Sequence, residues 1–197
     1  MKERGMIFNG EMTRAILDGR KTQTRRPVKF PVHDKNLGCE LAGNELAGEL
    51  SAGNYLNSAF GKPGDRIWVR ETWNKYGGLL TYRADHDWID DMRKETVCTA
   101  KWVPSIHMPR WASRILLEIT DVRVERLNAI SQEDAQAEGM ELTGWRPTYS
   151  DPDSGGEVMT PYDNFAELWS SIYGDESWKA NPWVWVIEFK RVEGGAA

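Results

Sequence analysis

The sequence predicts an α+β fold in which a small, partly open β-barrel carries helices at its ends and long loop insertions. Strand-like and helix-like segments follow one another in the order strand, helix, strand, several strands, two helices and a final strand. Distant strands would then pair antiparallel around one core. A chain of 197 residues with ten tryptophans and 40% hydrophobic residues can fill that core. We expect a single domain over residues 1–193.

The first elements have clear start and stop signals. Residues 6–8 form a short apolar run that begins a sheet. Asn9 is suited to cap a helix whose apolar residues follow helical spacing, and Gly19 would end that helix in the left-handed conformation. Residues 21–26 alternate short and long polar side chains, which is typical of a strand with one face toward a cleft. Pro27 ends this strand.

The middle of the chain mixes loops with short strands. Residues 27–60 contain no tryptophan, include several Gly and Asn and show no firm period, so we expect an insertion or a long loop. The K-P-G-D sequence at residues 62–65 predicts a type II turn that leads into a strand at 66–72. Residues 79–83 are the expected hairpin partner of that strand, and the acidic residues 85–95 form the expected surface helix.

A long strand follows a loop with the composition of a binding segment. Residues 102–111, W-V-P-S-I-H-M-P-R-W, combine two prolines with aromatic rings, a histidine and an arginine. Residues 114–126 carry the longest strand signal. Their apolar positions change parity between Ile119 and Val122, which predicts a bulge near Thr120 and Asp121.

Two helices and a strand close the chain. Ser131 and Gly139 bound the first helix, and residues 141–160, rich in Gly, Pro and Asp, predict a loop. Residues 163–173 predict an amphipathic helix. In the last strand, at 183–192, one face carries Trp183, Trp185, Ile187 and Phe189.

Composition excludes several classes of function. No apolar run is long enough to span a membrane or to form a signal-peptide core, so we expect a cytoplasmic protein. Two distant cysteines and three scattered histidines predict no disulfide and no metal site, and we expect no cofactor. The net charge of −5 argues against non-specific binding of duplex nucleic acid. Residues 1–30, with eight basic and three acidic side chains, instead fit a site for one small anionic or polar ligand.

The basic segment holds the first candidate site. Arg20, Lys21, Arg25 and Arg26 are crowded together, and such repulsion indicates an anionic or polar partner. Lys21 and Thr24 lie three residues apart, so they reach one pocket only if the strand twists between them. In that case the arginines would lower the pKa of Lys21, and a neutral lysine can deprotonate a threonine hydroxyl. The alternative is a solvated basic strand.

Two further groups are candidates. Glu138 lies in the last turn of its helix, where the macrodipole favours cations, so it needs a cationic partner such as a lysine or arginine of the basic segment. The alternative is an exposed glutamate at a helix end. In the proline-rich loop, His107 would lie near a pocket, and Arg110 and Trp111 could bond and stack on a base. The alternative there is a tryptophan that covers the end of the barrel.

Taken together, these segments resemble the ASCH family of the PUA-like superfamily. The resemblance rests on G-R-K-T-Q-T-R-R at residues 19–26, P-G-D-R-I-W-V-R at 63–70, A-E-G-M at 137–140 and V-I-E-F-K at 186–190. The longer type of this family, often found in phages and prophages, also has the W-V-P-S-I-H-M-P-R-W-A-S-R stretch found at 102–114. The resemblance implies a PUA-like β-barrel with a cleft for a nucleobase or nucleoside.

The resemblance also implies an activity. The best-understood small bacterial member is an amidohydrolase that removes the acetyl group from N4-acetylcytidine. Its lysine, threonine and glutamate correspond to Lys21, Thr24 and Glu138. Lys21 would deprotonate Thr24, whose oxygen attacks the amide carbonyl, and Glu138 would hold Lys21 or bond the cytosine amino edge. Arg26 or backbone N–H groups would stabilise the oxyanion. The expected substrate-binding residues are Arg20, Arg26, His107, Arg110 and Trp111.

The chain departs from that small relative in length. The relative is about half as long, so insertions at about 27–60, 73–111 and 141–160 have no counterpart in it. The alternative function is therefore an RNA- or DNA-binding module, or a ribonuclease, that is encoded by a phage and recognises a nucleobase, modified or unmodified. The amidohydrolase predicts an enclosed pocket for a nucleoside or base. The alternative predicts an open groove for RNA or single-stranded nucleic acid, and neither involves a membrane.

Overall fold

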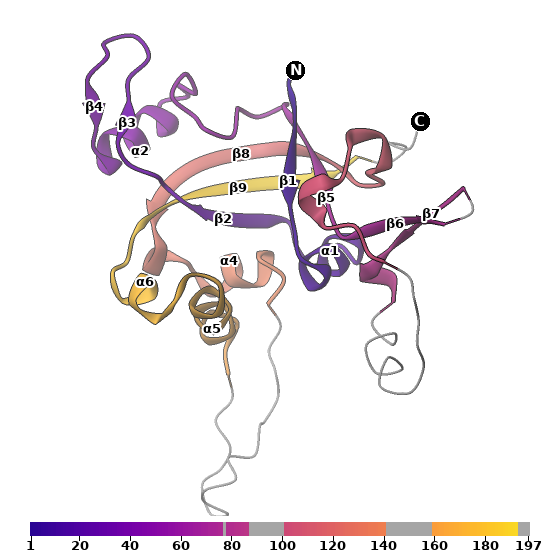
Figure 1. The fold of residues 1–197 in the computed structure, drawn as a ribbon. Coiled ribbons are helices and arrows are strands. Elements are labelled where there is room, and N and C mark those ends of the chain that lie inside the picture. The colour runs from indigo at the N-terminus through magenta and orange to yellow at the C-terminus, as the bar shows by residue number, and fades with distance from the viewer. Residues whose placement is uncertain (77, 87–100, 141–158, 193–197) are drawn as a thin grey trace, which may run out of the picture. The chain divides into compact units, whose positions relative to one another are not determined.

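The computed structural model describes residues 1–76, 78–86, 101–140 and 159–192 (Figure 1). It confirms the predicted α+β class. The main sheet has five strands in the order β1-β5-β8-β9-β2, with parallel pairing of β1 and β5 and antiparallel pairing of β5 with β8 and of β9 with β2. Because β1 and β2 end this order, the sheet in the described ranges has two edges and is not a closed barrel.

The chain divides into two compact units, which we describe separately. Unit 1 comprises Met1–Gly19, Gly64–Ile119 and Phe189–Ala197, and unit 2 comprises Arg20–Pro63 and Thr120–Glu188. Strands β8 (Leu116–Arg126) and β9 (Trp183–Arg191) each continue from one unit into the other.

Unit 1 begins with β1 (Glu3–Ile7), which pairs with β5 (Arg66–Arg70). Helix α1 (Gly10–Leu17) follows β1, and the Asn9 side chain accepts a hydrogen bond from the Met12 backbone N–H at 2.8 Å. Gly19 then adopts a φ of 77°, which glycine tolerates without a steric cost. Both predicted helix signals are confirmed, and they fix where the basic segment begins.

The hairpin of unit 1 differs from the predicted one. Strand β7 (Leu79–Tyr82) pairs with β6 (Trp73–Tyr76) and not with residues 66–72. Strand β5 lies between β1 and β8, so both of its edges are already hydrogen-bonded and β7 finds no open edge there. The helix predicted at 85–95 lies almost entirely outside the described residues. Short 3₁₀ helices follow at η1 (Arg83–Asp85), η2 (Ser105–His107) and η3 (Arg110–Ala112).

Unit 2 contains β2 (Gln23–Pro27), which pairs with β9 so that Thr24 lies opposite Ile187. The described helical segments of this unit after β8 are η4 (Leu127–Ala129), α4 (Gln132–Ala137), α5 (Pro161–Tyr173) and α6 (Asp175–Lys179). Phe165 and Trp169 of α5 and Ala135 of α4 bury Val184 and Val186 of β9. Trp185 and Ile187, which were predicted to share the other face, are buried as well.

Residues 27–60 are more regular than the sequence predicts. They form β3 (Val32–His33), β4 (Glu40–Leu41) and helix α2 (Gly43–Ser51), which buries Leu46 and Leu50. The glycines of this helix obscure its helical periodicity in the sequence. Gly43 is nevertheless required by packing. A Cβ at position 43 would overlap the indole ring of Trp183, so the close approach of α2 to that ring requires glycine.

The predicted change of parity in β8 is confirmed. Leu117 and Ile119 are buried in its first half, and Val122 and Val124 are buried in its second half. The change falls where β8 passes from unit 1 to unit 2. The loop predicted at 141–160 lies outside the described residues up to position 158. In the part of the chain that is described, no helix is both long enough and apolar enough to cross a bilayer.

Candidate functional site

The predicted pair of Lys21 and Glu138 meets in unit 2. The Lys21 ammonium donates to the Glu138 carboxylate at 2.6 Å and to the Glu138 backbone carbonyl at 2.9 Å. The two residues are 2% and 3% exposed, so this is a fully buried ion pair. Their backbones form an isolated antiparallel bridge, and the Thr22 backbone N–H donates to the Ala137 carbonyl at 2.8 Å. The start of β2 is thereby attached to the end of α4.

Local sequence explains why Glu138 occupies this position. Ser131 caps α4, and its side chain accepts a hydrogen bond from the Asp134 backbone N–H at 3.0 Å. Glu138 is the C-terminal cap of the helix, and Gly139 follows with a φ of 93°. A carboxylate at this end faces the negative pole of the helix, so it requires nearby cations. Lys21 and Arg25 supply them.

Arg25 is the second cation of the site, and its side chain is fully buried. Its guanidinium donates to Glu138 at 3.2 Å, to Glu125 at 2.7 Å and to Asp134 at 3.1 Å. It also donates to the Gln23 side chain. Because an arginine keeps its charge at any physiological pH, Arg25 neutralises part of the Glu138 charge whatever the state of Lys21.

Arg123 extends this network toward the surface. It forms ion pairs with Asp121 at 3.4 Å, Glu125 at 3.2 Å and Asp134 at 3.4 Å, and also with Glu188. Gln23 donates to both Asp134 and Glu188 at 3.1 Å. We call the set formed by Lys21, Gln23, Arg25, Arg123, Glu125, Asp134, Glu138 and Glu188 the charge network.

The sequence pointed to Lys21, to Glu138 and to a cation of the basic segment as the partner of Glu138, but not to the other members of the charge network: Gln23, Arg123, Glu125, Asp134 and Glu188. A usable signal was present, because Lys21, Gln23 and Arg25 alternate along the chain and all three bond residues of α4 or its cap. Because all three side chains are buried, they need polar partners from another element. Which element supplies them depends on long-range packing, and the sequence does not give that.

Burial lowers the pKa of Lys21, and the Glu138 carboxylate acts in the opposite direction. Arg26 and Arg25 lower this pKa further by repulsion. The predicted direction is the same, although the largest cause is desolvation rather than the arginines. Arg20, which was expected to contribute, donates to the Gly139 carbonyl at 3.4 Å. For Asp134, burial acts to raise the pKa, but the Gln23 hydrogen bond and the two arginines hold it below its usual value.

Thr24 is 2% exposed and lies between Gln23 and Arg25 on β2. Side chains alternate along a strand, so Thr24 and Arg26 leave β2 on the face opposite to Gln23 and Arg25. Among the described residues, no hydrogen bond joins the Thr24 hydroxyl to Lys21 or Glu138. The structure therefore brings Lys21, Arg25 and Glu138 together and leaves Thr24 outside their hydrogen bonds.

The other predicted binding residues divide between the two units. Arg20 and Arg26 belong to unit 2, and Arg26 lines a cavity of about 520 Å³. His107, Arg110 and Trp111 belong to unit 1. His107 is exposed in η2, and Arg110 pairs with Glu3 at 3.0 Å.

Trp111 is 62% exposed. Its ring meets Trp73 edge-on at 5.6 Å, and the Lys75 ammonium lies 5.4 Å from its centroid. This leaves part of an aromatic surface accessible beside a cation in unit 1, which is the kind of surface on which bases stack.

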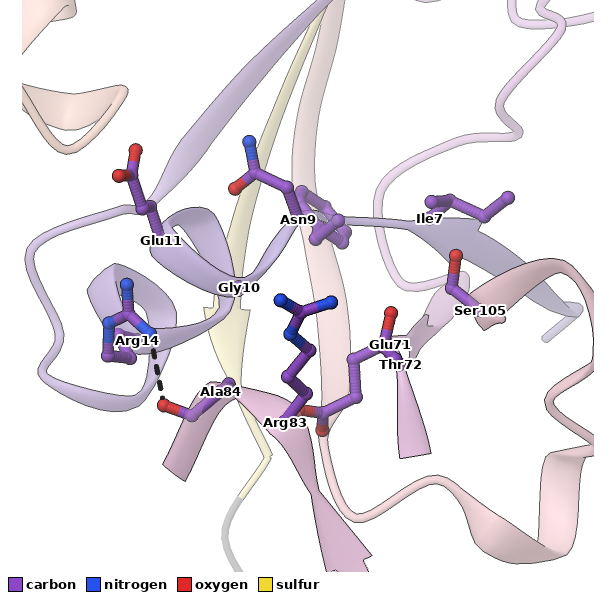
Figure 2. Close-up of a pocket in the computed structure, with 11 residues that line it drawn as sticks. Ile7, Asn9, Gly10, Glu11, Arg14, Glu71, Thr72, Arg83, Ala84 and Ser105 are labelled. Carbon is purple, nitrogen blue, oxygen red and sulfur yellow. Dashed lines mark hydrogen bonds between the residues drawn. The ribbon is translucent and has the colours of Figure 1, made fainter. Parts of the chain in front are cut away.

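Unit 1 has a cavity of its own, of about 610 Å³ (Figure 2). Asn9 and Gly10 at the start of α1 form one side, and Thr72 and Arg83 form another. Glu71 also lines it, but both of its carboxylate oxygens accept hydrogen bonds from Arg114, at 2.9 and 3.0 Å. Within the described ranges, no group of three His, Cys, Asp or Glu side chains is arranged to hold a metal ion.

The fold and the site define an α+β protein with a buried lysine–glutamate pair inside a larger charge network. No family model matches the sequence, and no curated protein matches it. Among solved structures, the chain is similar to protein EF3133 from Enterococcus faecalis V583, described by the family model DUF984. The TM-score is 0.41 and the identity is 11%, over 98% of this chain and 81% of that chain. A similarity this distant assigns neither a family nor an activity.

Proposed function

We propose that this chain is an ASCH-family protein of the PUA-like superfamily and an amidohydrolase that removes the acyl group from N4-acylated cytosine nucleosides or bases. The observation that supports it best is the buried pair of Lys21 and Glu138, with Arg25 on the far carboxylate oxygen. Burying three ionised groups is costly unless they are paired, and an apolar core would serve folding equally well. Perturbed pKa values in such clusters are typical of catalytic sites.

The geometry suits Lys21 as a general base. A neutral lysine amine has two N–H donors and one lone pair in a tetrahedral arrangement. The backbone carbonyl and the carboxylate of Glu138 take up the two donors. The lone pair is then held in a fixed direction, and in the described part of the chain no side chain bonds to it. Burial, which lowers the pKa of Lys21, favours this neutral form.

The proposed reaction is acyl transfer in two steps. Lys21 takes the hydroxyl proton of Thr24, and the Thr24 oxygen attacks the amide carbonyl carbon. Because the Thr24 hydroxyl lies outside the hydrogen bonds of Lys21 in the structure, this step requires the two groups to come within hydrogen-bond reach when substrate binds. The C–N4 bond breaks, Lys21 returns the proton to N4, and the acyl group remains on Thr24 as an ester. In the second step Lys21 takes a proton from water, whose oxygen attacks the ester, and the carboxylic acid leaves as Thr24 regains its proton.

The remaining roles follow from this scheme. Arg26 lies on the same face of β2 as Thr24, so it can stabilise the oxyanion together with backbone N–H groups. Arg20, next to Lys21, is a candidate for substrate binding. Glu138 positions Lys21 and keeps its two donors occupied. We propose a nucleoside or base as the partner of the site and the cytoplasm of a bacterial host as its location, with no cofactor.

The test is conversion of N4-acetylcytidine to cytidine, followed by chromatography. We expect turnover by the wild type and a loss of about 10²-fold or more in Lys21→Met, because general base catalysis contributes that much. Thr24→Ser should retain activity and Thr24→Val should lose it. Thr22→Val is the matched control, since Thr22 is exposed two residues away. An acyl-enzyme found by mass spectrometry in the wild type and absent from Thr24→Val would identify the nucleophile.

Two results would refute this proposal. The first is no turnover of the nucleoside, the free base or longer N4-acyl derivatives. The second is equal activity in Lys21→Met and the wild type. The second candidate function, a module or ribonuclease that recognises a base in nucleic acid, would then gain support from the exposed ring of Trp111 beside Lys75. In that case a Trp111→Ala variant should bind single-stranded RNA more weakly than the wild type.

A further inference from the structure

The cavity of unit 2 that Arg26 lines lies at the edge strand β2. It has a volume of about 520 Å³, within the range of small-molecule sites. Most of its lining comes from the segment 27–60, and the rest comes from β2, β9 and the end of α5. The lining residues that matter here are Arg26, Lys29, Phe60, Tyr173 and Trp185.

Aromatic rings form one part of this pocket. Phe60 and Trp185 meet edge-to-face with their centroids 5.8 Å apart at an angle of 70°. Trp185 lies in β9 opposite Arg26 and is only 3% exposed, so it supports Phe60 from behind, and Phe60 offers the more accessible ring. Tyr173 is 37% exposed at the last residue of α5. Flat rings of this kind bind another flat ring, such as a nucleobase, by stacking.

Two cations form the other part. Arg26 and Lys29 lie three residues apart where β2 ends, and both line the pocket. Among the described residues Lys29 pairs with no carboxylate, and its side chain is exposed. Asn57, by contrast, is 5% exposed and already engaged, since it donates to Glu49 at 2.8 Å and accepts from the Lys35 backbone N–H at 3.0 Å. The polar ligand contacts are therefore cationic.

We infer that this pocket binds a nucleotide, with its base against the aromatic wall and its phosphate at Lys29 and Arg26. The inference deepens the proposed function, and it rests on that function where it takes Thr24 as the acyl-transfer site. Thr24 and Arg26 share a face of β2 and lie two residues apart, about 7 Å along a strand. A phosphorylated substrate then reaches both the acyl-transfer site and the pocket, so the enzyme prefers a nucleotide, free or in a single strand, over a nucleoside.

The test is isothermal titration of the full chain with cytidine, with cytidine monophosphate and with a short single-stranded oligoribonucleotide. None of these ligands is acylated, so binding does not depend on turnover. We expect the monophosphate to bind about tenfold more tightly than cytidine, because charge-assisted hydrogen bonds to phosphate are strong. Raising the salt concentration should reduce this preference. An oligonucleotide that binds more tightly still would identify the polymer as the source of the nucleotide.

Two pairs of variants give the controls. Lys29→Gln should reduce the preference for phosphate, which Arg26 then maintains only in part, and should leave cytidine binding unchanged. Lys179→Gln, which changes an exposed lysine of the same unit outside the pocket, should alter neither. Phe60→Leu should weaken the binding of cytidine and of its monophosphate to a similar extent, by about fivefold or more, because stacking is lost. Phe30→Leu, in the same segment and 46% exposed, should not. Thermal unfolding of each variant checks that it is folded.

The outcomes separate this inference from the proposed function. Equal affinity of the wild type for cytidine and its monophosphate overturns the nucleotide pocket, as does an equal effect of Lys29→Gln and Lys179→Gln. Hydrolysis of N4-acetylcytidine in that situation leaves the amidohydrolase standing. A phosphate preference that depends on Lys29, without hydrolysis of any acylated ligand, supports the pocket and refutes the amidohydrolase.

Discussion

Replacing both members of the buried pair in turn measures how strongly Lys21 and Glu138 depend on each other. Lys21→Met leaves Glu138 with Arg25 at 3.2 Å and removes the donor from a buried carbonyl. Glu138→Gln leaves two buried cations without their shared carboxylate. Removing one partner of a buried pair typically costs about 3–5 kcal/mol. We expect each variant to lose about 3 kcal/mol of unfolding free energy, at the lower end of this range. In the first variant Arg25 still pairs with Glu138, and in the second Lys21 can release its proton.

The double variant Lys21→Met/Glu138→Gln should cost much less than the sum, with a coupling free energy of about 2–3 kcal/mol. The measurement is urea unfolding of the four proteins followed by tryptophan fluorescence. Lys179 and Glu176 form the control pair, since they lie 3.0 Å apart with side chains that are 69% and 89% exposed. We expect no measurable coupling there. Equal coupling in the two cycles would refute the view that burial makes the Lys21 pair strong.

The same variants test the direction of the Lys21 pKa. The folded protein holds this pKa below the ordinary value of 10.5, so between the two values the unfolded chain binds more protons. The free energy of unfolding therefore rises with pH across that window, and part of it is lost as the pH falls through the folded-state pKa. Lys21→Met should flatten this slope. An unchanged slope would contradict the assigned direction.

Three further predictions concern the scaffold. Gly43→Ala should lower the unfolding free energy by about 1–3 kcal/mol because the added methyl group overlaps Trp183. Gly48 lies in the same helix with open space around it, so Gly48→Ala should raise the unfolding free energy by about 0.5–1 kcal/mol. Urea unfolding measures both. Tyr82→Phe removes a buried hydrogen bond of 2.9 Å to a backbone carbonyl, and should lower the unfolding free energy by about 1–2 kcal/mol. Burial raises the pKa of Glu71 in the folded protein above its ordinary value of 4.5, so between these two pKa values the folded protein binds more protons than the unfolded chain. Stability therefore falls as the pH rises through this range. Glu71→Gln should remove this fall from the pH dependence of the unfolding temperature.

Local signals in the sequence were reliable where the structure is determined locally. The Asn9 cap and the Gly19 stop of α1, and the Ser131 cap of α4, each depend on a few neighbouring residues. The parity change between Ile119 and Val122 was also readable, because burial alternates along any strand. These features place the start of the basic segment and the end of α4, which is why Lys21 and Glu138 could be singled out.

Features that depend on distant partners were missed. Helix α2 exists because Leu46 and Leu50 are buried and Gly43 fits against Trp183, a residue remote in sequence. The partner of β7 was misjudged, since the sequence does not show that β5 already has two neighbours. The same holds for Arg25, whose carboxylate partners come from β8 and from α4. Whether Thr24 acts with Lys21 stays a prediction.

The position of β2 at the end of the strand order has a consequence for how variants should be handled. A strand at a sheet edge exposes unpaired backbone groups that can recruit a strand from another molecule. Pro27 ends β2 without an N–H donor, and Arg25 and Arg26 place charge along it, which are the features by which natural edges resist such association. Substitutions that remove these charges to study catalysis therefore also weaken a safeguard against aggregation, and light scattering belongs beside every activity measurement made on them.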